Sequence, residues 1–178
     1  MANSWGVLGA GMHVAMHAVG KITLFLCAGA IYVATHKTLV SQLDGLGRRM
    51  PFTMTAFGIG ALCVIGLPPM GGSWSKWFLA LGAAEAGQVW LIAALMISTL
   101  LNIAYLMPIA ARAFFVPTAT APDDHYAEET GESGIREAPI FCVVPLCVTA
   151  LGCLILFFAG GEIYELLEPM AMIPEVAP

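Results

Sequence analysis

Apolar residues fill five long stretches of the chain, and short segments rich in polar residues, glycine or proline separate them. Long apolar stretches with few charges are typical of helices in a lipid bilayer, because a helix bonds its backbone polar groups internally. The predicted fold class is therefore all-α, a polytopic membrane protein with about five transmembrane helices, one of them broken. The predicted helices cover residues 5–35, 52–67, 73–84, 89–115 and 140–158.

The connection between the second and third stretches interrupts the helical pattern. Its sequence, Gly-Leu-Pro-Pro-Met-Gly-Gly, cannot form a regular helix, because proline lacks a backbone N–H and glycine loosens the backbone. Irregular backbone at membrane depth persists only where it lines protein or a water-filled cavity, and such breaks recur at the ion sites of transporters. The helix-break residues are Gly66, Pro68, Pro69, Gly71 and Gly72.

Two polar regions adjoin the last apolar stretch. The first, at residues 117–139, is an acidic loop that we expect to be a solvated connection. The second follows residue 161 and carries glutamates at helical spacing, which is typical of a short amphipathic surface helix. We therefore divide the chain into a transmembrane helical domain at residues 1–161, which includes the acidic loop, and a short polar tail at residues 162–178.

The composition indicates that lipid, not water, is the main solvent of this chain. Only 11% of its residues are charged and 59% are hydrophobic, whereas roughly a quarter of the residues of a soluble domain are charged. The first apolar stretch is too long for a cleaved signal peptide, so we expect it to remain in the mature chain. A net charge of −5 without a basic face gives no support to nucleic-acid binding. The five cysteines lie in apolar runs without zinc-site spacing, so we interpret them as packing residues.

A polar stripe runs along the first predicted helix. His13, His17 and Lys21 are four residues apart, so each is rotated by only about 40° from the one before. A charged lysine facing lipid at mid-depth costs at least about 2.5–3.5 kcal/mol, so Lys21 must face protein or water, or be neutral. Lysines buried in apolar surroundings and histidines both exchange protons near neutral pH. The stripe is a candidate proton path; the alternative is a set of hydrogen bonds between helices.

Lys76 is a fourth ionisable candidate, at the start of the third stretch. It is flanked by Trp74 and Trp77, an arrangement that is also typical of a lysine that extends to the membrane surface. The interrupted backbone that precedes it favours a role in ion transport instead.

No carboxylate lies well inside any predicted helix, so Lys21 has no acidic partner at its own depth within the chain. Its partner is water, a histidine, or an acid from another chain, and this favours a larger assembly. Haem bound by two histidines on different helices gains no support, because no second helix holds a histidine in its interior. We expect no cofactor and no metal.

The sequence resembles one family over the residues from His13 to Lys76. The run His-x3-His-Ala-x2-Lys-x2-Leu-Phe-x3-Gly, at residues 13–29, is similar to a helix of the antiporter-like membrane subunits. These are the proton-channel subunits of respiratory complex I and of the related Mrp-type sodium/proton antiporters, and membrane-bound hydrogenases use similar subunits. The same order and spacing hold for Leu-Asp-Gly-Leu at 43–46, Arg-Met-Pro at 49–51, Gly-Leu-Pro-Pro at 66–69, and Ser75-Lys76.

The resemblance implies that His13, His17 and Lys21 belong to the central hydrophilic axis of such a subunit. It implies that Lys76 is the ionisable residue of the broken helix, near the exit of the channel. It also implies that the loop at residues 37–51 lies outside the cytoplasm. Ser73-Trp74 stands where the family usually has Gly-Phe. The family's subunits have many more helices, so we expect a split subunit, with a separate chain supplying the N-terminal helices.

We therefore expect a proton-translocating, or monovalent cation/proton-exchanging, subunit of a multisubunit complex in a bacterial or archaeal plasma membrane. Two alternatives remain: a non-transporting structural subunit of such a complex, and an independent transporter formed by homo-oligomerisation. The distribution of basic residues does not determine the orientation of the chain in the membrane. If all five stretches span, three basic residues (Lys37, Arg48 and Arg49) lie on one side and two (Arg112 and Arg136) on the other.

Overall fold

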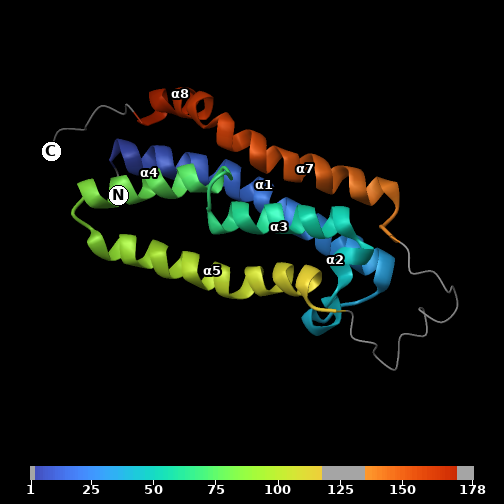
Figure 1. Ribbon diagram of the computed structural model, residues 1–178. Helices are drawn as coiled ribbons and strands as arrows, with labels where there is room; N and C mark the ends of the chain where they lie inside the picture. The colour runs from blue at the N-terminus through green and yellow to red at the C-terminus, as the bar shows by residue number, and fades with distance from the viewer. Residues whose placement is uncertain (1–2, 118–134, 172–178) are drawn as a thin grey trace, which may run out of the picture.

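The computed structural model describes residues 3–117 and 135–171, and these form helices joined by turns (Figure 1). All five predicted helices are present, so the predicted all-α membrane fold is confirmed. Three helices, α1, α5 and α7, are long and apolar enough to cross a membrane. The elements are α1 (Ser4–Thr35), the 3-10 helix η1 (Val40–Leu43), α2 (Leu46–Arg49), α3 (Pro51–Ile65), α4 (Gly72–Glu85), α5 (Val89–Phe115), α7 (Ile140–Phe158) and α8 (Gly160–Ala171).

Helix α1 is the central element, and α3, α4, α7 and α8 pack against it. It begins at Asn3, whose side-chain oxygen accepts the N–H of Gly6 at 3.0 Å, as an N-cap does. It ends at His36, a residue in the left-handed conformation whose N–H donates to the Tyr32 carbonyl at 2.8 Å. At about 1.5 Å per residue, its 32 residues exceed the thickness of a bilayer core.

Helices α3 and α4 lie one after the other along α1 (Figure 1). With 15 and 14 residues, each is shorter than the 20 or so that a span needs. Together they match the length of α1. The second and third predicted helices are therefore two halves of one broken crossing.

This broken crossing changes where the basic residues lie. The Arg112 guanidinium donates two hydrogen bonds of 2.8 Å to the Asp44 carboxylate, and the Arg136 N–H donates to the Arg49 carbonyl at 2.8 Å. Arg112 and Arg136 are thus at the same end as Arg49. The two arginines would lie on the opposite side only if all five predicted helices spanned the membrane, and this condition is not met because α3 and α4 together match one crossing.

The opposite end of the molecule is acidic. The N-terminus of α1 lies there beside the end of α4, where the Asn3 amide donates to Glu85 at 2.8 Å. Helix α8 packs beside it, and the Ser4 hydroxyl donates to the Ala171 carbonyl at 3.2 Å. Helix α8 carries the three glutamates of the tail, Glu162, Glu165 and Glu168. The helix expected in this tail is present, whereas residues 172–178 lie outside the described residues and the domain boundaries stay a prediction.

One residue of the acidic loop does more than connect helices. The Glu137 carboxylate accepts the N–H of Phe52 at 2.7 Å and the hydroxyl of Thr53 at 2.6 Å. It thereby caps α3, whose first N–H groups have no partner inside the helix. The expectation that the loop is a solvated connection is therefore wrong for Glu137, because its carboxylate binds the start of α3. The rest of the predicted loop, at residues 118–134, is outside the described part of the chain.

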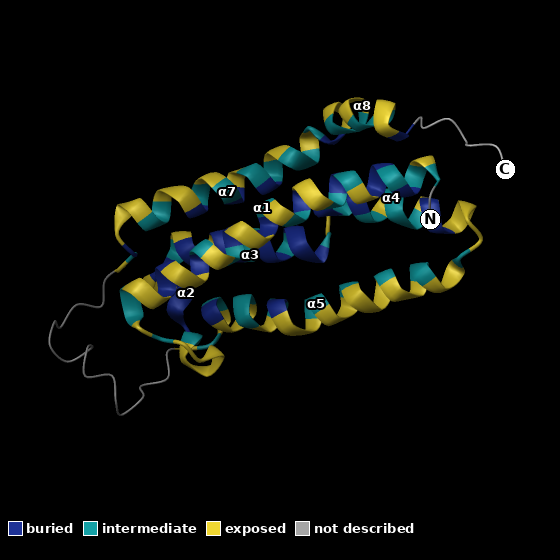
Figure 2. Cartoon of the chain, turned by 180° about the vertical axis from the view of Figure 1, so that it is seen from behind, coloured by how far each residue is buried: buried dark blue, intermediate teal, exposed yellow. Residues whose placement is uncertain are grey.

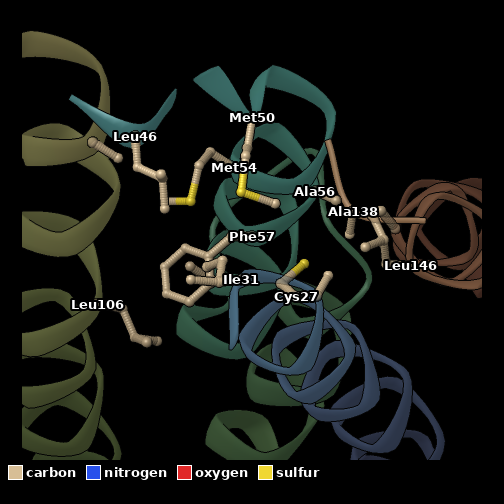
Figure 3. Packing of buried hydrophobic residues seen from close by; sticks show 14 of the residues in the cluster. Cys27, Ile31, Leu46, Met50, Met54, Ala56, Phe57, Leu106, Ala138 and Leu146 are labelled. Carbon is tan, nitrogen blue, oxygen red and sulfur yellow. The ribbon is translucent and has the colours of Figure 1, made fainter. Parts of the chain in front are cut away.

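The main core lies where α2, α3 and the second half of α1 meet (Figure 3). Met50 and Met54 are fully buried there, and flexible methionine fills irregular gaps between helices. Close approach of α1 and α4 depends on glycine: a Cβ on Gly82 would lie 2.6 Å from the Gly6 nitrogen. Helix α5 differs, since only Leu106 and Ala113 are buried along it and most of its surface is exposed and apolar (Figure 2).

Candidate functional site

The interruption between α3 and α4 creates the polar centre of the molecule. Helix α3 ends at Ile65, and Gly66 follows with φ of +82°, a conformation that favours glycine. Pro68, Pro69 and Gly71 lie in the connection, and Gly72 is the first residue of α4. A Cβ on Gly72 would overlap the Cys63 carbonyl. Helix α4 therefore starts directly against the last turn of α3.

Lys76 lies one turn into α4, and its side chain returns to the interruption. Its ammonium donates to the Ile65 carbonyl at 2.6 Å and to the Thr99 hydroxyl at 2.8 Å. The last carbonyls of a helix have no partner within it, and an unmet carbonyl at membrane depth is costly. The half-buried Lys76 therefore closes the end of α3, and the alternative in which it extends to the membrane surface does not describe this structure.

Thr99 of α5 is a site residue that the sequence did not single out. Its hydroxyl donates to the Leu95 carbonyl at 2.9 Å, so its oxygen is free to accept from Lys76. A threonine in an apolar helix is a weak signal by itself. Only the packing of α5 beside α4 brings Thr99 to the ammonium.

His13 of α1 joins the same centre through Ser75, which the sequence named only beside Lys76 in the family resemblance and not as a site residue. The His13 Nδ1 lies 3.0 Å from the fully buried Ser75 hydroxyl, which in turn lies 3.0 Å from the Gly72 carbonyl. If the Ser75 hydroxyl donates its hydrogen to the Gly72 carbonyl, its oxygen must accept a hydrogen bond from His13. The imidazole proton of His13 is then on Nδ1. His13 and Lys76 are thus held by neighbouring residues of α4.

His17 and Lys21 continue the stripe away from this centre. The rings of His13 and His17 are stacked, with centroids 5.1 Å apart. Lys21, one turn further, is exposed beside the exposed Phe25, and within residues 3–117 and 135–171 it has no hydrogen-bond or ion-pair partner. The stripe therefore begins inside the chain and ends on its outer surface, because each step of four residues turns by about 40°.

Electrostatics link the four residues without any carboxylate between them. The charge of Lys76 acts on both His13 and His17, and the charge of Lys21 acts on His17. An ion pair joins Arg112 to Asp44, but it lies at the basic end of the molecule, away from these four residues. The arrangement can take up and release protons, with water needed between the stacked rings and the lysines.

Ionisable side chains within apolar helices, beside an interrupted helix, are characteristic of membrane proteins that move ions. The sequence comparisons agree with this class. The family described as NADH:quinone oxidoreductase/Mrp antiporter, TM, matches residues 1–102, and the chain belongs to this family.

The relatives carry the similarity beyond residue 102. NADH-quinone oxidoreductase subunit N of Desulforudis audaxviator is 35% identical over 92% of this chain and 33% of its own length. Hydrogenase-4 component B of Escherichia coli is 30% identical over 88% of this chain and 23% of its own length. NADH-quinone oxidoreductase subunit L of Mycobacterium tuberculosis is 29% identical over 89% of this chain and 25% of its own length. The chain spans between about a quarter and a third of these relatives.

Proposed function

We propose that this chain forms one half-channel of an antiporter-like subunit and conducts protons, or exchanges them for a monovalent cation, within a multisubunit membrane complex. Protons move from His13 and His17 through water to Lys21 on one side, and Lys76 transfers them towards the other side. The observation that carries this proposal is the meeting of His13, Ser75 and Lys76 at the interrupted helix, at 3.0 Å between the first two.

The position of Lys21 supports a partner beyond these helices. Its exposed ammonium lies among apolar side chains on a membrane-spanning helix, where lipid contact is unfavourable. We propose that further helices of the antiporter-like subunit, or of a neighbouring membrane subunit, cover this surface and contribute a polar or acidic group. Membership in a family whose members include subunits N and L of NADH-quinone oxidoreductase agrees with such an assembly.

Proton movement in proteoliposomes that contain the assembled complex tests this function. Lys76→Ala and Lys21→Ala should each reduce proton translocation while the complex still assembles. Arg48→Ala, an exposed basic residue outside the site, is the matched control and should leave translocation unchanged. Unchanged translocation in both lysine variants would contradict the proposal.

A structural role is the second candidate, and the bond from Lys76 to the end of α3 favours it, since the same bond stabilises the fold. In that case Lys76→Ala would abolish assembly, and variants that assemble would translocate protons normally. Replacing sodium by potassium or choline in the proteoliposome assay separates pure proton conduction from cation exchange.

We further propose that the basic end faces the cytoplasm of a bacterial or archaeal cell. Five of the seven Lys and Arg residues (Lys37, Arg48, Arg49, Arg112 and Arg136) are at that end or in its connections, and such residues are retained on the cytoplasmic side. This is opposite to what the family resemblance implied for the loop at 37–51. A membrane-impermeant maleimide should label Arg48→Cys in inverted vesicles and not in intact cells; the reverse result would overturn the orientation.

A further inference from the structure

An apolar groove lies between α3 and α7, away from the ionisable centre. Residues 51–59 of α3 and 147–154 of α7 line it, and its volume is about 350 Å³. Phe52, Thr55 and Leu151 are exposed along it, so the groove opens towards the lipid side of the bundle. Both helices start at the basic end of the molecule (Figure 1). The groove begins at Pro51, the first residue of α3, and extends along that helix to Ile59.

Two arginines lie close in the chain to the start of α3, where the groove begins. Arg49 is two residues before Pro51, which lines the groove, and Arg136 is tied to Arg49 by a backbone hydrogen bond of 2.8 Å. Both side chains are exposed, and among the residues described no carboxylate pairs with either of them. The neighbouring Glu137 is directed at the first turn of α3, where Phe52 and Thr53 bind it.

From this arrangement we infer that the groove binds an anionic phospholipid. One acyl chain occupies the apolar groove, and Arg49 and Arg136 bind the phosphate. A basic cluster next to membrane helices is the pattern by which proteins recognise anionic lipids. The two exposed arginines therefore favour an anionic occupant over a neutral one.

Photo-crosslinking in the assembled complex tests the inference. The complex is reconstituted in phosphatidylcholine vesicles that contain a minor fraction of phosphatidylglycerol with a photoreactive group on its acyl chain. Labelled peptides should map to residues 51–59 and 147–154. A phosphatidylcholine probe with the same photoreactive chain should label them much less, because its headgroup carries no net charge.

Variants separate the headgroup contact from the acyl-chain contact. Arg49→Gln and Arg136→Gln should each lower labelling about fivefold, the effect expected of one basic residue at an anionic membrane surface. The corresponding Arg→Lys variants keep the charge and should retain most of the labelling. Thr55→Phe fills the groove and should abolish labelling there, whereas Val144→Phe, on an exposed position of α7 outside the groove, should not.

Two results would overturn the inference. Equal labelling by the two probes, unchanged in the arginine variants, would mean ordinary lipid contact at an apolar surface. Labelling that is absent in the complex and appears only after another subunit is removed would mean that a protein partner covers the groove. Neither result depends on proton translocation, so this site and the proposed function are tested independently.

Discussion

Lys76 and Lys21 are both lysines in apolar helices, yet their surroundings differ. Lys76 has two acceptors within the chain, the Ile65 carbonyl and the Thr99 hydroxyl, at 2.6 and 2.8 Å. Lys21 is exposed on the outer face of α1. The difference shows that the interrupted helix supplies Lys76 with a free carbonyl acceptor, which Lys21 does not have. On the unbroken α1 the backbone has no acceptor to spare, so Lys21 depends on groups outside these helices.

The largest expected effect comes from removing the Lys76 ammonium. Lys76→Met keeps an unbranched side chain like the aliphatic part of lysine but removes the ammonium. The Ile65 carbonyl then has no donor, which should lower the free energy of unfolding by about 1–3 kcal/mol. Lys21→Met is the matched control and should cost nothing in the isolated chain, because it breaks no bond there. Thermal unfolding in detergent measures both, and equal losses would refute the contrast between the two lysines.

Glycine substitutions test the interruption itself. Gly66→Ala places a side chain at φ of +82° and 2.8 Å from the Lys76 Cδ, so we expect a loss of about 1–2 kcal/mol. Gly29→Ala is the control within α1, where a Cβ would meet nothing within 4 Å, and a gain of up to about 1 kcal/mol is expected from helix propensity. Chemical unfolding should show a lower free energy of unfolding for Gly66→Ala and an unchanged or higher one for Gly29→Ala. If Gly66→Ala left the stability unchanged, the turn at residue 66 would not be constrained.

A smaller effect is expected from Thr99. Thr99→Val preserves the shape of the side chain but removes one acceptor of Lys76, so a loss of about 0.5–1.5 kcal/mol should follow. The Ile65 carbonyl still accepts, and this keeps the effect below that of Lys76→Met. Thr149→Val is the control, because the Thr149 hydroxyl donates only to the Leu146 carbonyl of its own helix. If Thr99→Val lowers the free energy of unfolding no more than Thr149→Val does, Thr99 of α5 is not part of the site.

The smallest effect concerns the charge pair at the basic end, between Asp44 and Arg112 in the last turn of α5. The Arg112 guanidinium, through its hydrogen bonds, holds the pKa of the Asp44 carboxyl below its ordinary value. A lowered pKa stabilises the fold above the ordinary pKa of about 3.9, and this stabilisation is lost as the pH falls through the lowered value. Asp44→Asn should therefore be slightly less stable than the native chain at neutral pH and equal to it in strong acid. A difference that persists in acid would assign the effect to packing.

Much of the fold could be predicted because each helix has a local cause. The long apolar runs predicted α1, α5 and α7, and the glycines and prolines at residues 66–72 predicted the interruption. The pairing of distant segments could not be predicted in this way. Glu137 was expected to be a solvated loop residue. The side of Arg112 and Arg136 depended on whether all five predicted helices span, because hydropathy does not show whether two short helices cross once or twice.

The amino-acid sequence by itself determined which ionisable groups lie along the apolar helices: His13, His17, Lys21 and Lys76. Only the tertiary structure decided how each is satisfied. Ser75 and Thr99 became part of the site because α4 packs between α1 and α5, and Lys21 did not because its face of α1 points outward. Helical spacing determines the relative direction of side chains on one helix, whereas contacts between helices depend on how their surfaces fit together.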